Sequence, residues 1–105
     1  MSSIFTIKMN YQRSIRQAEQ LDRLAEQIRR VGSSKIKQAR EAEARGWKGD
    51  NEKLMRTKHE VLQDKVNTTA NSLRNIANAI RTIAKNTYDA EMRAWEIAHR
   101  RTYNG

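Results

Sequence analysis

The stretch GWKGDN, residues 46–51, decides the fold, because it interrupts a helical pattern that continues on both sides of it in this chain of 105 residues. Glycine reaches positive φ without a side-chain penalty and usually follows a helix C-terminus, whereas Asp or Asn accepts the free N–H groups of the next helix. One helix is therefore expected to end near Gly46 and another to begin near Asp50. The stretch predicts a helical hairpin whose interhelical seam is capped by Trp47.

The composition excludes most alternatives to helices. The chain has no proline, four glycines and no cysteine, and 31% of its residues are charged. Breakers are scarce and good helix formers predominate, so we expect a single all-α domain. Two long helices share only one seam and leave apolar surface in water, so we expect the hairpin to dimerise into a four-helix bundle. Without cysteine, disulfides and thiolate metal sites are excluded.

In the first half, Phe5, Ile7 and Met9 alternate, which predicts a short extended arm over residues 1–10. From Tyr11 the apolar residues recur at threes and fours, which predicts a helix over residues 11–45. Residues 32–34 are weak helix formers, but no proline enforces a stop there, and the helix is expected to be continuous.

The second half predicts a helix over residues 50–101, with residues 46–49 as the turn. Its apolar positions repeat every seven, and small alanines lie beside this heptad pattern at Ala70, Ala77, Ala84 and Ala98. We expect one seam to make both the hairpin and its interface with a partner. Its residues are Leu21, Leu24, Ile28, Leu73, Ile76, Ile80 and Ile83.

The expected helices differ in length, so the first would accompany the second only to about Lys85. Beyond that point Tyr88, Met92, Trp95 and His99 follow one another at steps of four, three and four, with Glu91 among them. This stripe indicates either a docking site for a partner or a surface that the arm or a second subunit covers.

The net charge of +9 raises the possibility of nucleic-acid binding, but basic and acidic residues are mixed on the outer face expected for the first helix. Five opposite-charge pairs also stand at helical spacing: Glu19–Arg23, Glu26–Arg30, Glu41–Arg45, Glu52–Arg56 and Asp89–Arg93. This pattern favours a solvated surface. A basic helical nucleic-acid-binding protein remains the alternative, with no specific nucleic acid expected under the preferred interpretation.

Enzymatic chemistry finds no support in the pattern. His59 and His99 are the only histidines, and forty residues of one helix would separate them by about 60 Å. No glycine-rich phosphate loop, nucleophile elbow or metal-ligand cluster is present in the sequence. We expect no catalysis, cofactor or metal. Residues 1–10 lack the features of a secretory signal and no apolar run approaches about 18 residues, so we expect no stable membrane insertion and, for any export, another route.

The length, the central Trp47-Lys48-Gly49, the two flanking helical patterns and the absence of cysteine and of a cleavable signal resemble a known family. It is the WXG family of small type VII secretion proteins, the early-secreted-antigen-like hairpins. The ending from Ile76 to Trp95 looks like that of Gram-positive members.

This resemblance implies a hairpin that pairs with itself or a related hairpin, leaves the cell folded through a type VII secretion ATPase, and acts as cargo or as an escort. Some relatives escort the helical N-terminal domain of a larger LXG-type toxin. The chain would lie in the cytoplasm before export and be secreted without a cleavable signal peptide. Trp47 and Gly49 would set the turn, and Tyr88, Glu91 and Trp95 are candidates for recognition by the secretion machinery or a partner.

The chain also departs from the family pattern. A frequent C-terminal signal places an acid four positions after Tyr, but Met92 follows Tyr88 at that distance and Glu91 is one place early. A second pattern that begins and ends in His is matched only at Trp95 and His99. The basic charge is less typical of well-known acidic members and slightly favours a heterodimer with an acidic partner over a homodimer.

Overall fold

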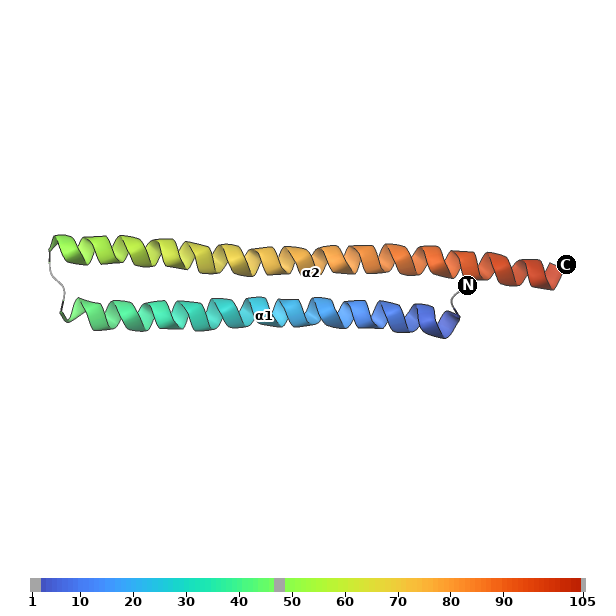
Figure 1. The fold of residues 1–105 in the computed structure, drawn as a ribbon, viewed down its shortest axis with the longest axis horizontal. Helices are drawn as coiled ribbons and strands as arrows, with labels where there is room; N and C mark the ends of the chain where they lie inside the picture. Colours follow the sequence, from blue (N-terminus) through green and yellow to red (C-terminus); the bar gives the residue numbers. More distant parts are fainter. Residues whose placement is uncertain (1–2, 47–48, 105) are drawn as a thin grey trace. The chain divides into compact units, whose positions relative to one another are not determined.

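The computed structural model describes residues 3–46 and 49–104, with side chains as far as Arg100. It contains two long helices, α1 (Ile4–Ala44) and α2 (Asp50–Asn104). Figure 1 shows the two helices side by side and antiparallel. The predicted all-α helical hairpin is confirmed.

The turn between the helices depends on one glycine with positive φ. That glycine is Gly49, at φ 70°, and its carbonyl accepts the N–H of Lys53 at 3.3 Å in the first turn of α2. At the end of α1 the N–H of Gly46 donates to the carbonyl of Glu43 at 3.0 Å. The helix ends predicted near Gly46 and Asp50 are confirmed, but positive φ falls at Gly49 rather than at Gly46. Trp47 lies outside the described residues, and its predicted role stays a prediction.

The extended arm predicted for residues 1–10 is wrong for residues 4–10, because α1 already begins at Ile4, whereas residues 1–2 lie outside the described residues. The Oγ of Ser3 accepts the N–H of Thr6 at 3.1 Å and its carbonyl accepts the N–H of Ile7 at 3.0 Å, so Ser3 caps the helix. Ile7 is only 2% exposed, whereas Phe5 is 71% exposed. Three alternating apolar residues fit a strand or a helix equally well, and packing of Ile7 against α2 decides for the helix. As predicted, α1 continues through residues 32–34.

The chain divides into two compact units. Unit 1 consists of Met1–Leu21 and Asn75–Gly105, and unit 2 of Asp22–Arg74. Each unit contains a segment of α1 and a segment of α2. Unit 1 buries Ile7, Ala18, Ala77 and Ala84, and unit 2 buries Ala25, Ala70 and His59.

Most of the buried apolar residues among those described are alanines. In unit 1, Ala77 and Ala84 are seven residues apart, which keeps small side chains on one line of α2. Small side chains let two helix backbones approach closely. In unit 2, the helical segments lie so close that a Cβ added to Gly32 would be 2.9 Å from Cγ2 of Val66. Of the four alanines that the pattern placed beside the seam, Ala70, Ala77 and Ala84 are therefore buried in it, whereas Ala98 is half-buried.

The large residues predicted to make the hairpin are less buried than the alanines. Leu24, Ile76 and Ile83 are exposed at 43%, 51% and 65% of their surface. The remaining members of that predicted seam are half-buried: Leu21, Ile28, Leu73 and Ile80. The prediction that this row closes the hairpin is thus wrong for its exposed members, because close approach through alanine moves the large side chains to the flanks. The same row was also predicted to form an interface with a partner, and the exposure of these side chains is compatible with that prediction.

Candidate interaction surfaces

Unit 2 holds its helical segments together with polar contacts. Arg29 donates to Oδ1 of Asn71 at 2.9 Å, Arg74 donates to Oε2 of Glu26 at 3.0 Å, and Gln63 donates to Oγ of Ser33 at 2.9 Å. Residue numbers rise along α1 as they fall along α2, so these contacts fix an antiparallel register. Arg29 is half-buried and reaches across to α2.

A buried histidine lies at the turn end of unit 2. His59 is 6% exposed, and its Nε2 lies 3.1 Å from Oε2 of Glu43. Although the distance is short, Oε2 of Glu43 is buried and accepts no hydrogen bond of good geometry from the described residues. The two side chains are therefore close polar neighbours, and removing either one takes away the nearest polar group of the other.

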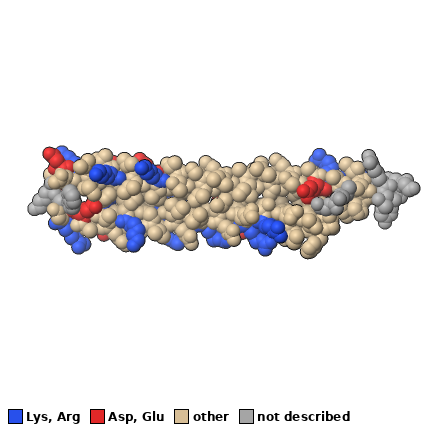
Figure 2. Space-filling model, viewed as in Figure 1, with Lys and Arg blue, Asp and Glu red and all other residues tan. Residues whose placement is uncertain are grey.

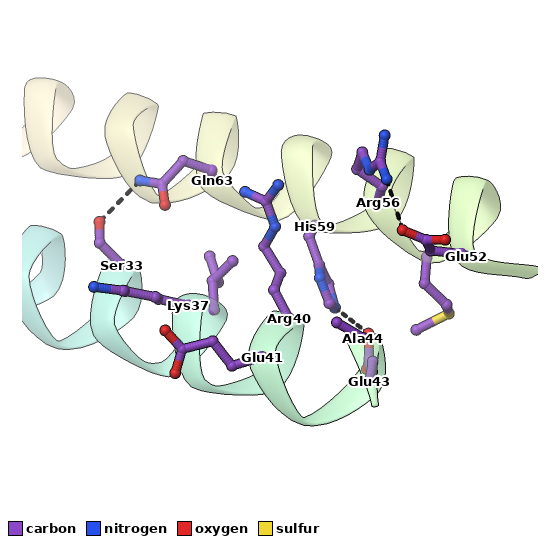
Figure 3. A pocket seen from close by; sticks show the side chains of 12 residues that line it. Ser33, Lys37, Arg40, Glu41, Glu43, Ala44, Glu52, Arg56, His59 and Gln63 are labelled. Carbon is purple, nitrogen blue, oxygen red and sulfur yellow. Dashed lines mark hydrogen bonds and ion pairs between the residues drawn. The ribbon is translucent and has the colours of Figure 1, made fainter. Parts of the chain in front are cut away.

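A groove of about 430 Å³ opens beside this pair. Figure 3 shows that Arg40 and His59 project into the space between the two helical segments, with Ser33 and Gln63 at one end. Arg56 is engaged with Glu52 at 2.7 Å. The described residues contain no group of three or more His, Cys, Asp or Glu side chains placed to hold a metal ion. The groove is thus a mixed polar surface with no metal site among the residues described.

In unit 1, an aromatic pair links the two helical segments. The rings of Tyr11 and Tyr88 lie 5.0 Å apart, centroid to centroid, at an angle of 44°. The prediction that α2 loses its neighbour beyond Lys85 is wrong for Tyr88. Because α1 begins at Ile4 and not at Tyr11, residues assigned to the arm accompany this part of α2 as a helix.

A second groove, of about 280 Å³, lies in unit 1. From α1 it receives the uncharged polar residues Asn10, Ser14 and Gln17. From α2 it receives an apolar wall that includes Ile80 and Ile83. Tyr88 and Glu91 also line it, so two of the three predicted recognition residues belong to one depression.

The third predicted recognition residue, Trp95, is placed differently. Its ring stacks on His99 with centroids 3.8 Å apart, and Nδ1 of His99 lies 2.8 Å from the carbonyl oxygen of Trp95. Trp95 is half-buried and does not line the groove that contains Glu91. The predicted set is therefore split between the groove and a stacked pair one helical turn further along α2.

The charged surface differs in detail from the predicted pattern. Glu52–Arg56 forms at the predicted spacing, whereas Glu26, expected to pair with Arg30, contacts Arg74 on the other helix. In the view of Figure 2, the middle of α2 presents surface without Lys, Arg, Asp or Glu side chains. On the face seen in this view, charge is thus unevenly distributed along α2.

Sequence reasoning missed Asn10, Ser14 and Gln17 as one wall of a groove. Their steps of four and three continue the line of Leu21, Leu24 and Ile28, and this shared helical face was the available signal. His59 precedes Val66, Leu73 and Ile80 at steps of seven, which was a signal for its burial, but its partner Glu43 lies on the other helix and could not be read from that spacing.

No family model matches the chain, and no curated protein or solved structure does either. The structure supports one part of the resemblance, which is a two-helix hairpin in a chain of 105 residues. Neither helix, over the described residues, is long and apolar enough to cross a membrane.

Proposed function

We propose that this protein is a small non-enzymatic adaptor or substrate of a type VII secretion system that pairs through an apolar face. The partner is either a second hairpin or the helical N-terminal domain of a larger LXG-type toxin, which the adaptor helps to target for export. The chain is cytoplasmic before export and then secreted without a cleavable signal peptide.

The observation that carries this proposal is the exposure of large apolar side chains on helices whose buried apolar residues are mostly alanine. Ile76 and Ile83 lie in unit 1, and Leu24 and Val31 in unit 2; each is more than two-fifths exposed. Exposed apolar rows of this size are unfavourable in water and are typical of surfaces that bind another chain. Together with the central Trp47-Lys48-Gly49, this supports a pairing hairpin of the WXG type.

Recognition for export is assigned in this proposal to Tyr88, Glu91 and Trp95 near the end of α2. Glu91 is the best single probe, because Tyr88 also packs against Tyr11 and its loss would disturb the fold. Glu96 offers a matched control, since it is an exposed glutamate on the same helix five residues further on.

The test is an export assay in the bacterium that encodes the chain. Deleting the type VII ATPase should retain the protein in the cells. Glu91→Gln should lower the secreted fraction severalfold while Glu96→Gln leaves it unchanged, and Trp47→Ala should abolish export or partner binding while much helix remains. Secretion that persists without the ATPase would refute the proposal, and normal export of Trp47→Ala would remove the role of the motif.

The alternative is a basic helical protein that binds nucleic acid, and the net charge of +9 is the observation that favours it. Retention on DNA at physiological ionic strength, falling steeply with added salt, would support that alternative. Two of the positive charges already make contacts within the fold. Arg29 of α1 donates to Asn71 of α2, and Arg74 of α2 donates to Glu26 of α1.

A further inference from the structure

The α2 segment of unit 2 carries a row of exposed apolar residues on its outer side. Leu54, Val61 and Leu62 are 54%, 48% and 48% exposed. None of the three lines the groove beside His59, so the row lies on another side of the helix. Exposed apolar side chains on neighbouring turns of one helix are unfavourable in water and are typical of a surface that another chain covers.

Two lysines lie within this row. Lys58 is three or four positions from all three apolar residues, and Lys65 is at these spacings from Val61 and Leu62. Residues at such spacings share a helix face. Both lysines are exposed, and neither makes an ion pair within the described residues, so each can meet a charge on another chain. We call these five residues of α2 the lysine-flanked row.

Acidic residues lie only at the margins of the lysine-flanked row. Asp50 is four positions before Leu54. Asp64 is three positions after Val61. Neither acid is at these spacings from Leu62, which has a lysine on each side along the helix. The two lysines are seven residues apart, which places them on one line of the helix, about 10 Å from each other. In the view of Figure 2, Lys or Arg side chains stand out from the half of α2 that begins at Asp50.

We infer that the lysine-flanked row docks an acidic amphipathic helix of another protein, in which two Asp or Glu side chains seven residues apart lie beside an apolar row. Lysines beside an apolar seam select the partner, because a cation that meets an acid is attracted and a cation that meets a cation is repelled. The inference rests on the proposed function, since it takes the exposed apolar side chains as a pairing surface and specifies the chemistry of the partner.

A second copy of the chain fits this row poorly. Two-fold pairing places the same patch on both chains, so Lys58 and Lys65 would approach their own counterparts. Exposed apolar surface on α1 of unit 2 has the same sign of charge, because Lys35 is the only charged residue three or four positions from Val31. The net charge of +9 by itself indicates no place for an acidic partner, and the lysine-flanked row supplies one.

Exposed lysines of unit 2 make the matched test. Lys58→Glu/Lys65→Glu reverses both charges of the row. Lys37→Glu/Lys53→Glu is the control, because it changes the net charge equally at two other exposed positions. Lys37 lines the groove beside His59, and Lys53 is not three or four positions from any apolar residue of the row. Circular dichroism verifies that both double variants keep their helices.

The probe is a synthetic amphipathic helix of about four heptads with leucine along one side and glutamate every seven residues beside it. Two further peptides carry glutamine or lysine in place of the glutamates. Fluorescence anisotropy at physiological ionic strength measures the dissociation constants. The parent should bind the glutamate peptide about tenfold more tightly than the glutamine peptide. Lys58→Glu/Lys65→Glu should weaken binding of the glutamate peptide by about tenfold and strengthen binding of the lysine peptide, whereas the control should change either value by less than about threefold.

Leu62→Gln tests the apolar part of the row. The side chain is 48% exposed, so the fold should persist, and the dissociation constant for the glutamate peptide should rise by about fivefold. An unchanged value would show that charge alone holds the peptide and would overturn the row as a docking surface. Tighter binding of a DNA duplex, lost in Lys58→Glu/Lys65→Glu, would overturn the acidic helix as the occupant.

The outcomes separate this inference from the proposed function. Equal weakening by the two double variants would overturn the row as the binding surface. A dimer of the chain alone, detected by sedimentation equilibrium, whose formation competes with the glutamate peptide would overturn another protein as the occupant. Export that needs the type VII ATPase, by a chain that binds no acidic peptide through the row, would overturn the inference and leave the secretion role standing. Binding of the glutamate peptide by a chain whose secretion needs no ATPase would do the reverse.

Discussion

Unit 1 and unit 2 use the same two helices and both bury alanine, but the further contacts described in them differ. Unit 2 adds directed polar contacts, among them Arg29 with Asn71 and Glu26 with Arg74. Unit 1 adds the buried Ile7 and the tilted pair of Tyr11 and Tyr88. Small residues let the helices approach closely in both units, whereas the polar contacts of unit 2 pair specific residues and so specify register.

The surroundings of two exposed apolar residues, one in each unit, also differ. In unit 2, Leu62 has Lys58 four residues before it and Lys65 three residues after it, so charge flanks it on the helix surface. In unit 1, the residues at these spacings from Ile83 are Ala79, Ile80, Asn86 and Thr87, which are uncharged. Only the second environment resembles the centre of a protein interface, from which charged residues are depleted. Leu24 of unit 2 also has uncharged neighbours at these spacings, so the comparison favours Ile83 over Leu62 as a residue at the centre of an interface but does not restrict pairing to one unit.

The largest expected effect comes from overfilling the small-residue contact of unit 1. Ala77 is fully buried, and Ala77→Leu should lower the free energy of unfolding by about 3 kcal/mol, because the helices must move apart to admit three more carbon atoms. Thermal unfolding by circular dichroism measures the loss, and amide exchange should rise more in unit 1 than in unit 2. Ala79→Leu, at an exposed position of the same helix, is the control and should change stability little. Equal losses for both variants would show that alanine at the contact is not required.

The next effect breaks the polar contact at the turn end of unit 2. His59→Ala removes a buried ring and leaves Oε2 of Glu43 without its neighbour, which should cost about 2 kcal/mol in the free energy of unfolding. Denaturant unfolding measures it. His99→Ala, at an exposed site near the end of α2, should have an effect well below this. If His59→Ala unfolds at the same denaturant concentration as the parent, His59 does not stabilise unit 2.

A smaller effect tests the close approach within unit 2. Gly32→Ala gains helix propensity of about 1 kcal/mol but places a Cβ 2.9 Å from Val66, and we expect the steric cost to exceed the gain. The melting temperature should therefore fall in the parent and rise when Gly32→Ala is made in a Val66→Ala background. A rise in both backgrounds would mean that α1 and α2 yield at this point without cost.

The smallest effect concerns the exposed pair of Glu26 and Arg74, whose atoms lie 3.0 Å apart. Both side chains are more than one-third exposed, so a double-mutant cycle with Gln at each position should give a coupling of about 0.2–1 kcal/mol that decreases with added salt. Coupling above that range would make this pair a major determinant of register. A value of zero would leave Arg29 and Gln63 as the contacts that set it.

Local patterns in the sequence were sufficient to predict two helices, the turn between Gly46 and Asp50, and the continuity of α1 past Gly32. These features depend on residues close together in the chain: breakers, caps and the spacing of apolar positions. Residues 1–10 were mistaken for an arm because three alternating apolar residues carry too little information, and burial of Ile7 in unit 1 decided between helix and strand.

Tertiary structure alone decided which row of side chains closes the hairpin. On α2 the alanines and the large apolar residues both repeat every seven, so their spacing is identical and periodicity cannot rank them. Only the close approach of two backbones in space favours the smaller row, and it places Ala77 inside and Ile83 outside. The same approach brings His59 to Glu43 and lines the groove of unit 1 with Asn10, Ser14 and Gln17. These pairings join residues distant in sequence, and they exist only once both helices have packed.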